Sequence, residues 1–220
     1  MPRLPVRWVL LAAALLSGLT IAACDNTSPV ASSTTPNPTA GAPLPELFLL
    51  RADQMRGYTR SNSHALSPNT VASDANNPAL AQTLTDQGYL EGATWTFNAP
   101  MPNTAGLPFG EVISEAAVFN DAAGASRNAD FEKTARNQPP SNGGTINTVS
   151  DLPATGVDSL TVYVAESTDG SNTSQTYLAI MRHGRVVAEL LAGGDPTTAT
   201  EKNFSTLLVL AEGLLASAPR

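Results

Sequence analysis

Cys24 carries the most reactive side chain in the sequence, because a thiol is a better nucleophile than the hydroxyl groups around it. It is the single cysteine among 220 residues, so no disulfide can form within the chain. A branched apolar residue and two small ones, Ile21, Ala22 and Ala23, precede it. The single thiol of the sequence therefore stands directly after two small residues.

Residues 1–23 have the three parts of a secretion signal. Arg3 and Arg7 form a positive first part, residues 8–16 are apolar, and Ser17 and Gly18 interrupt the apolar run. A membrane-spanning helix needs roughly 20 apolar residues. The segment is shorter than that, so we interpret it as a leader that is removed.

Residues 21–24 resemble the lipobox of bacterial lipoproteins at every position. The resemblance implies that a diacylglyceryl group is attached to the sulfur of Cys24 and that the leader is cut between Ala23 and Cys24. It implies a palmitate-type anchor on the extracytoplasmic face of the cell membrane. The alternative is an ordinary secretion signal followed by an incidental cysteine. Asp25 would favour the inner membrane in a two-membrane cell and carries no such meaning in a cell with one membrane.

Residues 24–45 are rich in Ser, Thr and Pro and contain too little apolar surface to offset the entropy cost of ordering. We predict an extended tether here. Residues 46–220 remain as a single domain, long enough to form a hydrophobic core.

The formal net charge is −7, and it becomes −9 if Arg3 and Arg7 are lost with the leader. An acidic chain without basic patches is a poor partner for nucleic acid. With two histidines and one cysteine, no His/Cys metal site is expected, and no cofactor motif is present.

Alternation of apolar and polar residues predicts strands at 92–97, 111–119, 159–165, 177–181 and 185–191. Helical spacing and capping signals predict helices at 47–57, 78–88 and 122–136. Thr198 and Glu201 have the spacing of a capping box, which predicts a last helix that follows them and runs to about residue 217. Residues 59–78 are polar without a clear period and are interpreted as a loop.

The same patterns predict a helix cap, a hairpin connection and the exposure of both histidines. In the helix at 122–136, we expect Asn120 or Asp121 to cap the N-terminus and Phe131 and Ala135 to face inward. We expect His183 and Gly184 to be the two residues that connect a hairpin, with the imidazole in solvent. His64 is likewise expected to be exposed in a polar loop.

These elements predict an α+β fold, an antiparallel sheet of about five strands packed by helices. Their order resembles a group of small domains found in actinobacterial lipoproteins and in the extracellular sensor part of a mycobacterial Ser/Thr kinase. Three segments carry the resemblance: residues 48–59, residues 177–190 and the last helix. It implies ligand sensing, or binding of a lipid or protein partner, in the cell envelope.

Few residues indicate catalysis. Glu111 and Glu115 are four apart in a predicted strand, but two carboxylates alone are no glycosidase signature. The nucleophile-elbow and phosphate-loop patterns are absent from the sequence.

Three hypotheses remain. The first is a lipid-anchored domain that binds a lipid, another apolar small molecule or an envelope protein; its candidate contacts are Trp95, Phe97, Tyr163 and Tyr177, each of which could equally be core. The second is a structural or assembly lipoprotein without a small ligand. The third, an enzyme, is the least favoured.

Overall fold

The computed structural model describes residues 43–101, 103, 105–136, 145–149, 152, 154–169 and 172–218. The leader, Cys24 and nearly all of the predicted tether lie outside these residues. Within the described part of the chain, no helix is both long and apolar enough to cross a membrane.

An antiparallel sheet is the centre of the fold. Its strands, in chain order, are β1 (Thr59–Leu66), β2 (Tyr89–Asn98), β3 (Glu111–Phe119), β4 (Thr145–Val149), β5 (Ser159–Asp169), β6 (Asn172–His183) and β7 (Val186–Gly194). In space the order is β1-β2-β3-β7-β6-β5-β4. The predicted α+β class is confirmed, although the sheet has seven described strands where the sequence predicted about five.

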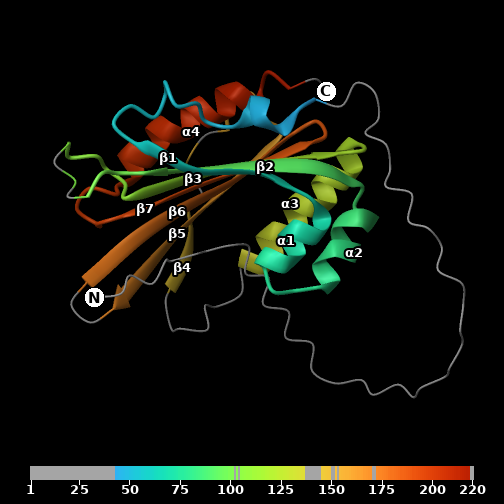
Figure 1. Cartoon of the computed structure of the whole chain (residues 1–220), viewed down its shortest axis with the longest axis horizontal. Coiled ribbons are helices and arrows are strands. Elements are labelled where there is room, and N and C mark those ends of the chain that lie inside the picture. The colour runs from blue at the N-terminus through green and yellow to red at the C-terminus, as the bar shows by residue number, and fades with distance from the viewer. Residues whose placement is uncertain are drawn as a thin grey trace, which may run out of the picture.

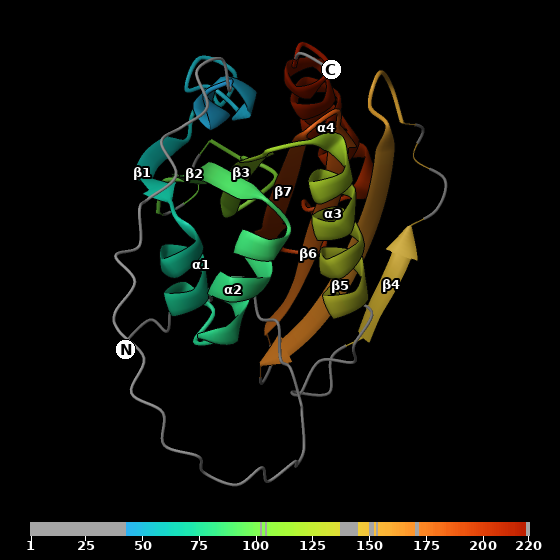
Figure 2. The same ribbon diagram turned by 90° about the vertical axis from the view of Figure 1, so that its right-hand side faces the viewer.

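Helices cover both faces of this sheet. On one face lie α4 (Glu201–Leu215) and the short 3-10 helix η1 (Pro45–Phe48); on the other lie α1 (Pro68–Asp74), α2 (Ala79–Asp86) and α3 (Ala122–Arg136). Figure 1 shows α4 and η1 above the sheet and the other three helices below it, and Figure 2 shows α1 and α2 side by side, with α3 nearer β5 and β6.

Each layer has its own core. Phe48, Phe97, Leu190, Phe204 and Leu215 belong to the cluster on the α4 face and are almost completely buried. On the α3 face, Leu80, Leu84, Phe119, Ala125 and Ile180 form a second buried cluster. The strands contribute to both clusters, because successive side chains of a strand point to opposite faces of the sheet.

The predicted loop at 59–78 was wrong, because it contains β1 and α1. The strand β1 forms the outer edge of the sheet and most of its side chains are exposed, so its polar sequence has no burial period to recognise. Ser67 then caps α1 by accepting a hydrogen bond from the Thr70 backbone N–H at 3.1 Å, and Pro68 occupies the first turn.

The hairpin between β6 and β7 is confirmed but shifted by one residue. His183 still pairs with Val186, so the connection is Gly184 and Arg185, and Gly184 has a φ of 54°. Glycine at the first central position fits a type II′ turn. The expectation of an exposed imidazole was wrong: as the last residue of β6, His183 faces the α4 side and is 4% exposed, with Nδ1 3.7 Å from Asp158 Oδ1.

Side-chain hydrogen bonds cap the N-termini of α3 and α4. Asp121 caps α3, accepting a hydrogen bond from the Gly124 backbone N–H at 2.7 Å, as predicted. In α4 the cap is Thr200, which accepts from the Asn203 backbone N–H at 3.3 Å. The predicted capping box at Thr198 was wrong, since its hydroxyl donates to the backbone of Pro108 instead.

Candidate functional site

A small cavity lies on the α3 face of the sheet, where the helices meet the central strands. Its volume is about 20 Å³, which is room for about one water molecule. Val71, Leu84, Tyr89, Glu115, Ala117, Asn128, Glu132, Val187 and Glu189 line it. We call it the helix-face cavity.

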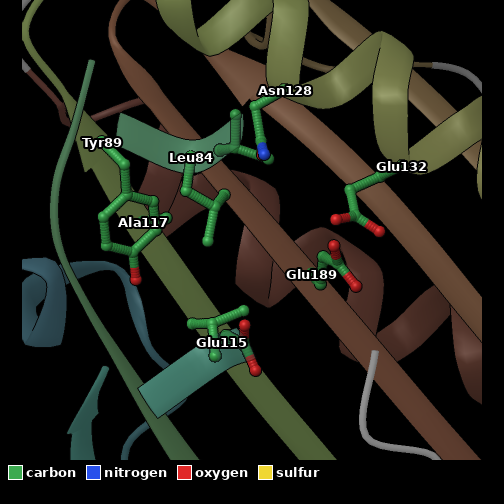
Figure 3. Close-up of a pocket in the computed structure, with 9 residues that line it drawn as sticks. Leu84, Tyr89, Glu115, Ala117, Asn128, Glu132 and Glu189 are labelled. Atoms are coloured by element: carbon green, nitrogen blue, oxygen red, sulfur yellow. The ribbon is translucent and has the colours of Figure 1, made fainter. Parts of the chain in front are cut away.

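Three glutamates from three elements converge at this cavity. Glu115 belongs to β3, Glu189 to β7 and Glu132 to α3. Figure 3 shows the carboxylates of Glu132 and Glu189 pointing toward one another, with Glu115 beside Glu189 on the neighbouring strand. Apolar groups form most of the remaining wall, so the site combines an apolar lining with concentrated negative charge.

Strand register forces two of these carboxylates together. Glu115 and Glu189 are directly opposite each other in the β3–β7 ladder, so their side chains leave the same face of the sheet at adjacent points. Side chains in this relation have Cβ atoms about 4.5–5.5 Å apart, and like charges there destabilise the sheet. The pairing is therefore costly for folding unless a counter-charge or a proton offsets it.

Arg136 is the counter-charge. As the last residue of α3, it places Nη2 3.7 Å from Glu189 Oε2 and 3.8 Å from Glu132 Oε2. Both distances exceed the usual 2.7–3.2 Å of an N–H···O hydrogen bond, and the buried Nε of Arg136 has no hydrogen-bond partner among the described residues. We call these three glutamates and Arg136 the Glu–Arg cluster; it is held by charge without close hydrogen bonds.

The pKa values of the three carboxyl groups respond to this arrangement. Burial, and then the charge of Glu189, raise the pKa of Glu115 to about 8 in spite of Arg136. Burial and the same neighbour raise the pKa of Glu132 well above its ordinary value, and burial raises the pKa of Glu189, against the pull of Arg136. The cluster therefore retains a proton near neutral pH.

Other polar groups extend the site across the sheet. Along β1, β2 and β3, His64 pairs in register with Thr94, and Thr94 with Glu115. The Nε2 atom of His64 lies 3.8 Å from Asp74 Oδ2 on α1. His64 is exposed as predicted, but it lies in β1 instead of a loop.

The inward face of α3 explains how part of the cluster enters the core. Asn128 and Glu132 are 5% exposed and lie on the buried face with Ala125 and Ala129. Of the two residues predicted to face inward, Phe131 is partly buried and packs against the core cluster on this face, whereas Ala135 is partly buried and is not part of that cluster. An apolar stripe was expected on the inward face of this helix, whereas Asn128 and Glu132 place polar side chains toward the sheet.

The aromatic candidates do not line this cavity. Trp95, Phe97 and Tyr177 pack in the α4-face core, where Tyr177 stacks on Phe204 with ring centroids 5.0 Å apart. Tyr163 lies in the opposite cluster, and its hydroxyl donates to the Lys133 carbonyl at 3.3 Å. The four side chains are thus divided between the two faces of the sheet, and their contact with a ligand stays a prediction.

Only Glu115 among the cluster residues was singled out from the sequence, as half of a pair with Glu111. These two are not partners in the site, because Glu111 is opposite Gly193 at the far end of the same ladder. Glu132, Arg136 and Glu189 were missed. A charged residue at an inward position of a strand, as at Glu189 between Ala188 and Leu190, is the signal that could have identified one of them.

No protein-family model matches the chain, and no curated protein matches it in sequence. Among solved structures, the fold is similar to that of the extracellular domain of PknH from Mycobacterium tuberculosis, with a TM-score of 0.51 and 10% sequence identity. The match covers 78% of this chain and 95% of that chain. The predicted resemblance to the extracellular part of a mycobacterial kinase is thereby confirmed at the level of fold.

Proposed function

We propose that this protein is a membrane-anchored, extracytoplasmic binding domain whose ligand site is the helix-face cavity. One observation carries the proposal: beside a cavity, the carboxylates of Glu132 and Glu189 lie 3.8 and 3.7 Å from a single guanidinium, and Glu115 adds a third carboxylate directly opposite Glu189. Among the described residues, no close hydrogen-bond donor meets these carboxylates, so a ligand that brings N–H groups and positive charge would fill their lone pairs. Similarity of fold to an extracellular domain supports the extracytoplasmic location.

The chemistry of the cavity favours a different ligand from the apolar molecule expected from the sequence. An apolar body would bury the carboxylates without replacing their water, at a cost of several kcal/mol per charge. A primary amine attached to a short apolar chain suits both the acidic cluster and the apolar wall. The present volume of about 20 Å³ accepts the ammonium head alone, so a longer ligand requires the helices to separate.

Titration with small amines tests the binding function. Methylammonium and putrescine should shift the NMR signals of Glu115, Glu132 and Glu189, while acetate should not. Glu189→Gln should weaken amine binding by about tenfold or more, the equivalent of one charge-assisted contact of about 1.4 kcal/mol. Glu166→Gln is the matched control, because Glu166 is an exposed glutamate on β5 outside the cluster.

Native mass spectrometry of the protein purified from its own cells gives an independent readout. A retained amine or other cationic metabolite supports the proposal. If the mass is bare and neither amine shifts the cluster, the binding function is refuted.

The anchor is proposed on separate grounds, the lipobox-like residues 21–24. Cys24→Ala should abolish incorporation of radiolabelled palmitate and release the protein from membranes, since two acyl chains supply the anchoring energy. Palmitate labelling that persists in Cys24→Ala would refute lipidation at this residue.

A second candidate function is structural or assembly work in the envelope without a small ligand. Exposed apolar side chains favour it: Leu44 and Leu47 at η1 and Val209 on α4 are 59%, 53% and 64% exposed. A photo-crosslinking residue at position 209 that captures one envelope protein in cells, together with silent amine titrations, would favour this alternative. We propose no catalytic activity.

A further inference from the structure

The Glu–Arg cluster joins two parts of the fold that are otherwise packed through different contacts. Glu115 and Glu189 belong to the sheet, whereas Glu132 and Arg136 belong to the last turn of α3. The first half of α3 is fastened separately, by the Asp121 cap and by a hydrogen bond of 3.0 Å from Asn128 Nδ2 to Gln87 Oε1. A change in the net charge of the cluster should therefore affect the last turn of α3, while the hydrogen bonds of its first half stay in place.

We propose that the Glu–Arg cluster is a proton-operated latch, closed when it holds a proton and opened at the last turn of α3 when that proton is lost. With a proton on the cluster, two ionised carboxylates face one guanidinium. After deprotonation, three carboxylates share the same guanidinium. Glu132 then gains most by moving into water, and it can do so only if the end of α3 leaves the sheet.

Most of the charged groups that face Glu115 favour the protonated form of the cluster. Glu189 on β7, Glu132 on α3 and Asp74 on α1 are acidic, and Arg136 alone opposes them among the groups that act on Glu115. His64 on β1 lies beside Asp74, while Tyr89 on β2 and Leu84 on α2 complete the wall. The pKa of Tyr89 is raised by burial and by the charges of Glu115 and Glu91, so its hydroxyl stays neutral over the same pH range.

Opening of the last turn would widen the helix-face cavity, which ties the latch to the proposed binding function. A cationic ligand would replace the proton as the partner of the carboxylates, so binding and proton release would be linked. The latch can nevertheless be tested without any ligand. Failure of amine binding and failure of the latch are thus separate results.

Hydrogen exchange of the full-length protein, as purified from the producing cells, tests the latch. After correction for the intrinsic pH dependence of exchange, protection of the amides at 132–136 should fall by about tenfold or more between about pH 6 and about pH 9, because each pKa unit corresponds to a tenfold change in an equilibrium. Amides in the first half of α3 should keep their protection.

Glu115→Gln should remove this pH-dependent loss, because an amide cannot ionise. Glu189→Gln serves as the second variant if Glu115→Gln does not fold, and Glu166→Gln should behave as the unmodified chain. Constant protection in the unmodified chain, or the same pH-dependent loss in Glu115→Gln or Glu189→Gln, would overturn the latch.

Discussion

At the scale of single residues, the opposed pair Glu115 and Glu189 is the feature that needs explanation. Like charges directly opposite each other destabilise the contact between two strands. Both residues are also partly buried, which raises the pKa of both carboxyl groups. A destabilising pair that lies beside a cavity is consistent with the proposed binding function.

Replacing Glu115 by Gln should stabilise the protein at neutral and mildly alkaline pH. The folded-state pKa of about 8 lies above the ordinary value of 4.5, so the folded chain binds a proton that the unfolded chain has lost. Stability is then greatest below the ordinary value and falls as the pH rises toward the folded one. In Glu115→Gln this fall should be reduced, by up to a few kcal/mol at about pH 8, since each pKa unit is worth about 1.4 kcal/mol.

Urea unfolding at several pH values between about 5 and 8.5 would measure this difference. Glu166→Gln should follow the original curve. A pH profile of Glu115→Gln that is as steep as that of the unmodified chain would place the proton on another residue.

At the scale of elements, α3 depends on a close approach to the end of α2. A Cβ atom added at Gly124 would lie 2.0 Å from the backbone oxygen of Gln87. Only glycine therefore allows the first turn of α3 to settle beside Gln87, whose side chain also receives the hydrogen bond from Asn128.

Gly124→Ala should destabilise the protein by about 1–3 kcal/mol, the usual cost of inserting an atom into a filled site. Gly213→Ala on α4 is the matched control, because a Cβ there meets nothing within 4 Å and Gly213 is exposed. That change should stabilise the helix by about 0.4–1 kcal/mol. Thermal unfolding of both variants would test the contrast, and equal effects would contradict it.

An element could be predicted from the sequence where its buried residues recur at a regular spacing. The strands β3 and β7 alternate between buried and partly exposed positions, and the last helix keeps Phe204, Leu208, Ala211 and Leu215 on one buried face. These were predictable. By contrast, β1 is an exposed edge without such a period. The site was not predictable either, because Glu115 meets Glu189 through the register of strands some 70 residues apart in the chain.

At the scale of the whole molecule, two helical layers share one sheet. Tyr177 belongs to β6 in the middle of this sheet and stacks on Phe204 of α4 with an interplanar angle of 17°. Both cores use alternate residues of the same strands, so neither can be lost while the other remains packed. We therefore expect the two layers to unfold together.

Phe204→Ala should lower the free energy of unfolding by about 3–5 kcal/mol, because the ring is completely buried. Trp95 fluorescence reports the α4-face core, and circular dichroism reports all elements; their unfolding curves should coincide and shift together in this variant. Two separate transitions would show that the layers are independent.

The join between β3 and β7 also affects how the chain avoids aggregation while it is being made. The sequence-local pairings build two half-sheets, β1-β2-β3 and β4-β5-β6-β7, and only the contact of β3 with β7 closes them. Until β7 has been synthesised, β3 is an open edge with unpaired backbone groups, which is a template for the strands of other chains. A charge in the middle of each unfinished edge, Glu115 on one and Glu189 on the other, discourages such pairing before the correct partner arrives.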